Sequence, residues 1–335
     1  MVREAGLPAV LVEAFSEAPL GGNGAAVVLL REPAPAAWMQ RVAGSLKQSE
    51  TAFLLPRRDG TWALRWFTPS REVPLCGHAT LASLLALAHW GQVAPGVATR
   101  FHSRSGPLTV RLLSPSASGS QAPPQGQLEL PRFPLNPLDP SLCADLLTWL
   151  SARPGMAPEA FWGSALGYQV VLLSPAAPLA DLRGVAASLP QGSRDGLVLM
   201  QPFSSSAESS APGDADALRP APVVAGMAPD YQLRFFAPGL GLEEDPVTGS
   251  AHALVAPYWL ERLQRARVVG WQCSDRPGGM VCEAGSSGMI RLTGCGNLLW
   301  EGTLQVGPRP GGADERAGEQ AFSASAREWD AACGP

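Results

Sequence analysis

The sequence of 335 residues has no apolar run that reaches the about 20 residues a membrane-spanning helix needs. Its N-terminus, MVREAGLPAV, lacks the apolar core and small-residue cleavage site of a signal peptide. No stripe of basic residues is present, and the net charge is −4. We therefore expect a cytoplasmic protein that binds neither a membrane nor a nucleic acid.

Cysteines are few and scattered, and no Cys-X-X-Cys pair occurs. They lie at Cys76, Cys143, Cys273, Cys282, Cys295 and Cys333. Disulfide frameworks belong mainly to small secreted domains, so we expect reduced thiols. His-X3-His and His-Glu-X2-His spacings are also missing, as are a Gly-X-Ser-X-Gly elbow and a Gly-X-Gly-X2-Gly loop. We expect no metal, no nucleotide or other cofactor, and no serine nucleophile.

The composition is that of a globular protein with a large core, because 46% of the residues are hydrophobic and 16% are charged. The length favours two domains. Stretches rich in Ser, Pro and Gly at 114–127 and 204–222 predict a linker and an insertion. We expect lobes at 1–120 and 128–306 and a flexible tail at 307–335, with a short helix as an alternative near its end.

Many short runs rich in Val, Leu and aromatic residues predict strands, among them AVLVEAF, AFLLP, YQLRFF, MIRLTG and LLWEGTLQV. Three segments predict helices: 36–47, 78–90 and 250–263. The second and third are apolar on nearly every side, so each is expected to be buried. Many strands with few buried helices predict an α+β fold in which each sheet curls around its own helix.

The two halves repeat a pattern. RWFTP at 65–69 matches RFFAP at 234–238, which lies 169 residues later. Gly77-His78-Ala79 matches Gly249-Ser250-Ala251 at a spacing of 172 residues, and a buried helix follows in each half. The order of strand, proline, loop, glycine and helix predicts an internal duplication.

The repeat predicts two helices that each begin with a glycine. The N-terminus of a helix carries free N–H donors and a partial positive charge, and glycine lets a ligand approach the backbone. If the copies face one cleft, Gly77 and Gly249 form a site for an anion, most simply a carboxylate. The alternative is that both glycines serve only packing, while Asp245 and Ser250 cap the second helix.

Six motifs in order resemble the PhzF-like family of phenazine-biosynthesis proteins: VEAFSEAPLGGNGAAVVLL, QSETAFLLP, LRWFTPSREVPLCGHATLASL, FHSRSGPLTV, RFFAPGLGLEEDPVTGSAHALVAPYW and QCSDRPGGM. The likeness spans roughly residues 8–306 and is strongest to the animal branch, whose members are also called MAWD-binding proteins. It implies a diaminopimelate-epimerase-like fold of two similar lobes with the active site between them. The last strand, near 297–306, commonly crosses back to the first lobe.

The resemblance also implies an activity. Bacterial members of the family are isomerases that shift a proton within a dihydro-hydroxyanthranilate without cofactor or metal. Glu50 matches the family's general acid/base, and His78 and Asp245 match its partners in orienting the substrate and moving charge. Gly77, Gly249 and Ser250 match the residues that hold a small carboxylate-bearing substrate. The family further suggests a homodimer.

Other interpretations remain open. Glu50 on its own is equally a solvated surface residue. Amino-acid epimerases of this fold use two cysteines, but Asp245 stands where a partner of Cys76 would be expected at the 169-residue spacing. Cys76 is therefore interpreted as a small buried residue, and a racemase would need a second base. A catalytically inactive module that binds a WD-repeat protein is the remaining alternative.

Overall fold

The computed structural model describes residues 6–114, 122–204, 222–308 and 315–334. The chain divides into two compact units. Unit 1 comprises Met1–Glu129 and Cys295–Pro335, and unit 2 comprises Leu130–Gly294. The chain therefore leaves unit 1 once and returns to it once. Among the helices of the described residues, none combines the length and the apolar character that a membrane crossing requires.

Unit 1 is a curled sheet around one helix. Along the sheet its strands are β1 (Leu7–Ala14), β2 (Asn23–Leu29), β3 (Glu50–Pro56), β4 (Trp62–Phe67), β6 (Ala98–Ser103), β7 (Gly106–Leu112) and β8 (Gln125–Pro131). The sheet closes because β16 (Met289–Leu304) neighbours both β8 and β1. The short β5 (Glu72–Val73) pairs with β4.

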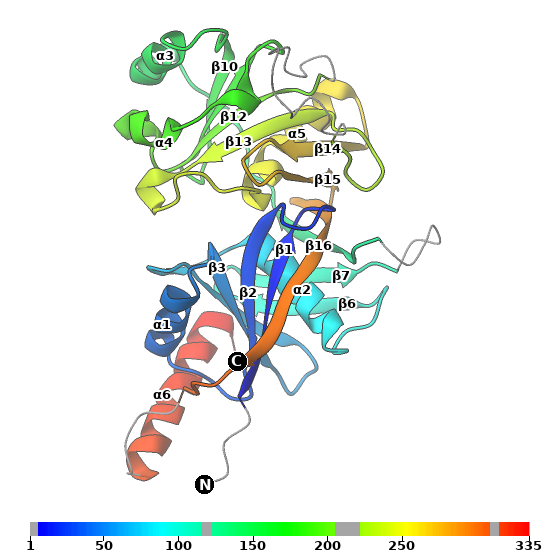
Figure 1. The fold of residues 1–335 in the computed structure, drawn as a ribbon, viewed down its shortest axis with the longest axis vertical. Coiled ribbons are helices and arrows are strands. Elements are labelled where there is room, and N and C mark those ends of the chain that lie inside the picture. Colours follow the sequence, from blue (N-terminus) through cyan, green and yellow to red (C-terminus); the bar gives the residue numbers. More distant parts are fainter. Residues whose placement is uncertain (1–5, 115–121, 205–221, 309–314, 335) are drawn as a thin grey trace. The chain divides into compact units, whose positions relative to one another are not determined.

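Helix α2 (Gly77–His89) is the core of unit 1. Every residue from Gly77 to Leu87 is buried, and the helix contacts β1, β2, β3 and β7 (Figure 1). Its Ala- and Leu-rich sequence suits a helix that meets strands on most sides. Helix α1 (Ala36–Leu46) is amphipathic instead and buries Trp38, Met39, Val42 and Ala43.

Unit 2 repeats this plan. From β16, the sheet continues through β15 (Gly278–Ala284), β14 (Arg267–Gln272), β13 (Tyr231–Phe236), β12 (Leu197–Pro202), β11 (Gln169–Leu173), β10 (Pro158–Gly163) and β9 (Asn136–Pro137). Helix α5 (Gly249–Leu263) contacts β14 and β15. Parallel pairs recur at matching places: β2–β3 and β4–β6 in unit 1, β11–β12 and β13–β14 in unit 2. The predicted α+β fold of two similar lobes is confirmed.

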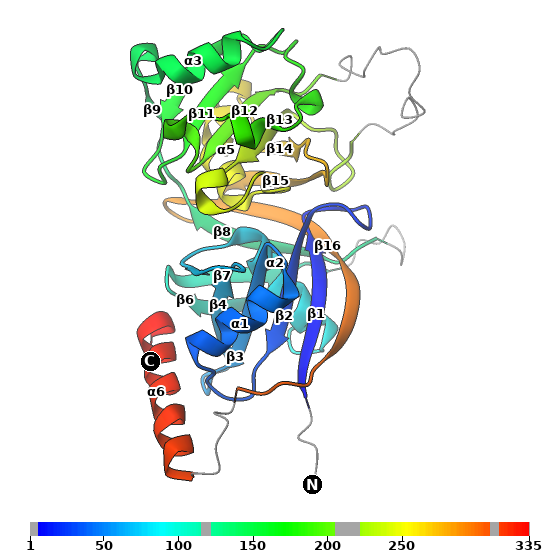
Figure 2. The ribbon, with the colours of Figure 1, turned by 60° about the vertical axis from the view of Figure 1, so that its left-hand side comes forward.

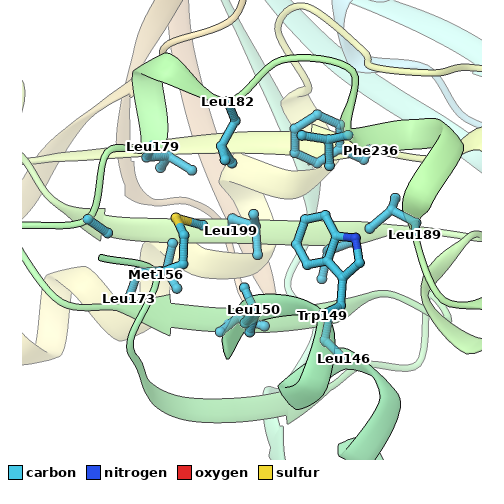
Figure 3. Close-up of a cluster of buried hydrophobic side chains, with 14 of the residues drawn as sticks. Leu146, Trp149, Leu150, Met156, Leu173, Leu179, Leu182, Leu189, Leu199 and Phe236 are labelled. Carbon is cyan, nitrogen blue, oxygen red and sulfur yellow. The ribbon is translucent and has the colours of Figure 1, made fainter. Parts of the chain in front are cut away.

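Besides the residues around α5, unit 2 has a hydrophobic cluster under its helices α3 (Ala144–Ser151) and α4 (Val185–Ser188). Figure 3 shows Trp149 and Leu150 of α3 directed at Leu199 of β12 and Phe236 of β13. Apolar residues of the intervening loops, including Met156 and Leu182, complete the cluster. This packing holds β12 and β13, from which the chain leads into α5.

The structure corrects three expectations about chain organisation. The segment 114–127 is not all linker, because Gln125 begins β8. MIRLTG and LLWEGTLQV are not separate strands but parts of the 16-residue β16. The second lobe ends at Gly294 and not at residue 306, because the last strand returns to unit 1, as the resemblance implied. The predicted insertion at 204–222 lies almost entirely outside the described residues.

The expectation of a flexible tail is wrong for residues 315–333, where the short helix considered near its end is a helix of 19 residues. Helix α6 (Glu315–Cys333) contacts β4 and β6 of unit 1 (Figure 2). The Trp329 side chain is buried, and its Nε1 donates to the carbonyl of Ala34 at 2.9 Å. The Glu328 carboxylate accepts from the N–H of Ala36 at the start of α1. Few apolar residues mark this helix, which is why composition alone suggested a tail.

Candidate active site

The first group of candidate residues lies in unit 1, where β3 and α2 begin. Glu50 is the first residue of β3, Cys76 is the N-cap of α2, and His78 is its second residue. Their exposed fractions are only 6%, 7% and 4%. Glu50 is therefore not the solvated surface residue of the alternative interpretation.

The His78 ring is held from several sides. Its Nε2 lies 3.0 Å from Oε2 of Glu50 and 3.2 Å from Oγ of Ser49. On the other side, Nδ2 of Asn23 lies 3.1 Å from Nδ1. Ser49 also donates to Oδ1 of Asn23 at 2.8 Å, so the two polar neighbours support each other. This arrangement fixes the imidazole with Nε2 on the side of the Glu50 carboxylate.

The electrostatics of this group favour a proton on His78. Burial by itself lowers the pKa of the imidazole, but Cys76 and Glu50 outweigh it and raise that pKa well above its ordinary value. Burial raises the pKa of the Cys76 thiol to about 11, and Glu50 adds to the shift. The raised pKa of His78 therefore comes from its two buried neighbours, Cys76 and Glu50.

Glu50 itself keeps an unsatisfied oxygen. Its Oε2 is buried and has no hydrogen-bond partner within the part of the chain that the structure describes, despite the 3.0 Å separation from Nε2. The distance allows a charge interaction, but the angle does not meet the geometry of a hydrogen bond. A buried carboxylate oxygen in this state is costly unless a ligand or substrate satisfies it.

The second group lies in unit 2, just before α5. The Asp245 carboxylate is buried and accepts from Oγ1 of Thr248 at 2.6 Å. Gln272 supports both residues: its Oε1 accepts from the Thr248 N–H at 2.8 Å, and its Nε2 donates to the Asp245 carbonyl. The loop is therefore rigid, and Asp245 orders it in addition to any role toward a substrate.

Gly249 and Ser250 open α5 as Gly77 and His78 open α2. The N-cap residues of the two helices, Cys76 and Thr248, make no side-chain cap hydrogen bond. Both N-termini therefore offer backbone donors with a partial positive charge. The Ser250 hydroxyl lies 3.4 Å from the hydroxyl of Tyr168, which the sequence analysis did not single out.

A pair of matching ion pairs confirms the duplication. Arg65 binds Glu72 through two hydrogen bonds of 2.8 and 2.9 Å, and Arg234 binds Glu244 through two of 2.7 and 2.5 Å. Each guanidinium also lies over a phenylalanine two residues later, at 5.4 Å from Phe67 and 5.2 Å from Phe236. These bidentate pairs fix the approach loop of each central helix.

The strand pairing shows which residues of the two units correspond. Thr51 pairs with Phe67 in unit 1, and Leu197 pairs with Phe236 in unit 2, so Glu50 corresponds to Gly196. The helix starts match Cys76 with Thr248. The earlier match of Cys76 with Asp245 is wrong, because the longer loop has already shifted the register at that point. Neither a second carboxylate nor a second thiol occupies a corresponding position.

His252, the other histidine near a predicted helix start, is a core residue. It is fully buried in α5, and its Nδ1 lies 2.8 Å from the hydroxyl of Tyr231. Burial lowers the pKa of His252 to about 3, so the ring is neutral. Sequence reasoning missed Asn23, Ser49, Gln272 and Tyr168, because a polar residue in a strand or loop gives no signal of its partner.

The chain matches the sequence profile of the phenazine biosynthesis-like protein family over residues 12–302. A human phenazine biosynthesis-like domain-containing protein is 30% identical, over 89% of this chain and 99% of its own length. An uncharacterized isomerase of Pseudomonas aeruginosa is 34% identical, over 88% of this chain and 97% of its own length. Helix α6 lies beyond the residues that the family profile covers.

Solved structures give the same fold. A PhzF-family protein from Enterococcus faecalis aligns with a TM-score of 0.69 and 29% identity, over 89% of this chain and 98% of the other. A probable proline racemase from Agrobacterium radiobacter aligns with a TM-score of 0.54 and 14% identity, over 90% of this chain and 94% of the other. The second likeness concerns the fold alone, and it confirms the epimerase-like architecture.

Proposed function

The chain belongs to the phenazine biosynthesis-like protein family, and we propose that it is an isomerase that shifts a proton within a small carboxylate-bearing substrate. The relatives named as isomerases support isomerase-type activity. In this proposal Glu50 is the general acid/base, and no cofactor takes part. His78 and Asp245 orient the substrate and balance its charge.

The observation that carries the proposal is the buried Glu50 carboxylate with an unsatisfied oxygen 3.0 Å from Nε2 of His78, an imidazole whose pKa is raised above its ordinary value. A base that removes a proton from carbon gains strength when water is excluded, and a neighbouring cation steadies the charge that develops on the substrate. Glu50 would take the proton from one carbon and return the same proton to another. The enzyme then ends each cycle in its starting protonation state.

A single base favours a proton shift over racemisation. Inversion at a carbon requires an acid on one face and a base on the other. The positions that correspond to Glu50 and Cys76 hold Gly196 and Thr248, which supply neither. One carboxylate that both removes and returns the proton suits migration along one face of a substrate.

The substrate carboxylate is assigned to a helix N-terminus. The backbone N–H groups at Gly249 and Ser250, and those at Gly77 and His78, are donors of the kind that bind carboxylates. Asp245 is a hydrogen-bond acceptor for a hydroxyl or amino group. A substrate with an acid group and such a donor would use both kinds of contact.

The test is conversion of metabolites in D2O. A metabolite extract is incubated with the protein, and mass spectrometry reports compounds that gain deuterium or change isomer. Wild type and Glu301→Gln, an exposed glutamate of unit 1, should convert the same compound. Glu50→Gln should not. Conversion by Glu50→Gln at the wild-type rate, or no conversion by any protein, would overturn the proposal.

A further inference from the structure

Unit 2 carries a tyrosine beside the position that corresponds to Glu50. Strands β2 and β3 pair in parallel, as β11 and β12 do, and Ala25 is the partner of Glu50 in the first pair. In the second pair the corresponding positions stand one residue before the first partners and hold Tyr168 and Gly196. Unit 1 therefore combines a small residue with a glutamate, whereas unit 2 combines a tyrosine with a glycine.

The Tyr168 ring fills the space that a side chain at position 196 would need. A Cβ added to Gly196 would lie 2.3 Å from Cδ1 of this ring. The ring also packs on Phe235, with centroids 4.8 Å apart, and the Phe235 carbonyl accepts the N–H of Asp245 at 3.1 Å. Unit 2 thus has no room for a second carboxylate at this place, and Tyr168 packs on the strand that also holds Asp245.

The Tyr168 hydroxyl lies against the start of α5 as the Glu50 carboxylate lies against the start of α2. It is 3.4 Å from Oγ of Ser250, the second residue of α5, while Oε2 of Glu50 is 3.0 Å from Nε2 of His78, the second residue of α2. A separation of 3.4 Å is long for a bond between two hydroxyls, so this contact adds little to the stability of the fold. Both Tyr168 and Ser250 are half-buried rather than sealed in the core. Unit 2 therefore presents two hydroxyl donors where unit 1 presents a carboxylate.

Charge decides which helix start suits an acid group of the substrate. A carboxylate at the start of α2 would meet Glu50, a group of the same charge. At the start of α5, the N–H groups of residues 249–251 precede the first helical hydrogen bond, which His252 donates to the carbonyl of Thr248. An anion there gains these donors and the adjacent hydroxyls of Tyr168 and Ser250.

We propose that Tyr168 determines the substrate specificity of the isomerase, because its hydroxyl, together with that of Ser250, donates to the carboxylate of the substrate at the start of α5. This role rests on the function proposed above and narrows it, since it assigns the acid group to α5 rather than to α2. A phenylalanine would fill the same space and pack on Phe235 equally well. The hydroxyl is therefore the part of Tyr168 that packing does not require.

The binding test needs no turnover. Benzoate serves as a carboxylate probe and benzamide as its neutral analogue of the same shape, and ligand-observed NMR titration of the full-length protein gives both dissociation constants. Wild type should bind benzoate more tightly than benzamide. Tyr168→Phe should weaken the binding of benzoate about 10- to 100-fold, the effect of losing one hydrogen bond to a charged group, and should leave that of benzamide within a few-fold.

Tyr258→Phe is the matched control. It removes the hydroxyl of another half-buried tyrosine of unit 2, which accepts from Arg262 on the same helix, and it should bind benzoate as wild type does. Circular dichroism confirms that each variant is folded. An unchanged benzoate affinity in Tyr168→Phe, or a wild type that does not prefer benzoate to benzamide, would overturn the proposal.

Kinetics give a second readout. With the compound that wild type converts in the extract assay, Tyr168→Phe should raise KM about 10- to 100-fold and leave kcat within a few-fold, because the carboxylate contact is the same in the ground state and the transition state. A lower kcat at an unchanged KM would contradict this role. Benzoate binding decides the role of Tyr168 even if Glu50→Gln keeps full activity, so failure of the two proposals can be told apart.

Discussion

Nε2 of His78 lies 3.0 Å from Oε2 of Glu50, and both side chains are buried. One belongs to the start of a helix and the other to the start of a strand. Their proximity concentrates an acid and a base in one small volume away from water. The proposed chemistry and several measurable properties of the protein follow from this pair.

The proximity of His78 and Glu50 predicts that the stability of the folded protein depends on pH. Folding raises the pKa of the imidazole, because Cys76 and Glu50 outweigh the effect of burial. The stabilisation is complete below the unfolded pKa of about 6.5 and is lost as the pH rises through the folded value. Urea unfolding should therefore show a larger loss of stability between about pH 6 and pH 9 in wild type than in His78→Gln. Equal losses would contradict this account of the pair.

The Cys76 thiol should be unreactive. With a pKa of about 11, only about one thiol in 1,000 is ionised at about pH 8, compared with roughly a quarter for an ordinary cysteine. Alkylation by iodoacetamide, followed by mass spectrometry, should be at least ~100-fold slower than for a peptide thiol. Glu50→Gln should speed it, because the carboxylate helps to raise the pKa. A rate near that of the peptide would show the thiol to be activated.

Helix α6 should contribute to the stability of unit 1. The Trp329 side chain is 3% exposed and packs with the cluster that includes Trp38 and Phe53. Truncating a buried tryptophan to alanine costs about 3–5 kcal/mol. Trp329→Ala should lower the free energy of unfolding by that amount in chemical denaturation. Trp300→Ala removes a ring that is 41% exposed and should change it much less. Equal effects would mean that α6 does not pack on the core.

Gly196 should be intolerant of a side chain. An added Cβ would lie 2.3 Å from Cδ1 of Tyr168, whose hydroxyl approaches Ser250. Overpacking of this kind costs about 1–3 kcal/mol. Gly196→Ala should therefore be less stable in thermal unfolding than Gly192→Ala, whose added Cβ meets nothing within 4 Å. Comparable melting temperatures would show that the Tyr168 ring can move aside.

The sequence predicted the central helices and the duplication well, because each signal was local. Apolar runs led by Gly77 and Gly249 marked α2 and α5 almost to the residue. The long strand β16 was predicted as two strands, because the glycines of TGCGN interrupt its apolar pattern. In the structure Gly296 instead allows close approach, since a Cβ there would lie 2.8 Å from the Glu13 carbonyl.

The candidate site was less accessible to sequence reasoning. No spacing rule relates Glu50 to His78, and only the family resemblance placed them together. Asn23 and Ser49 support the His78 ring from a strand and a loop, so their roles depend on pairing between distant segments. The homodimer and the WD-repeat partner stay predictions.

The most direct test of the central claim is the turnover number of Glu50→Gln with the compound that wild type converts. Glutamine keeps the size and polarity of the side chain but cannot accept a proton from carbon. General acid–base catalysis contributes about 10²- to 10⁴-fold, so kcat should fall by at least that factor. The dissociation constant of the compound should stay within a few-fold of wild type. An unchanged kcat would contradict the assignment of Glu50 as the acid/base.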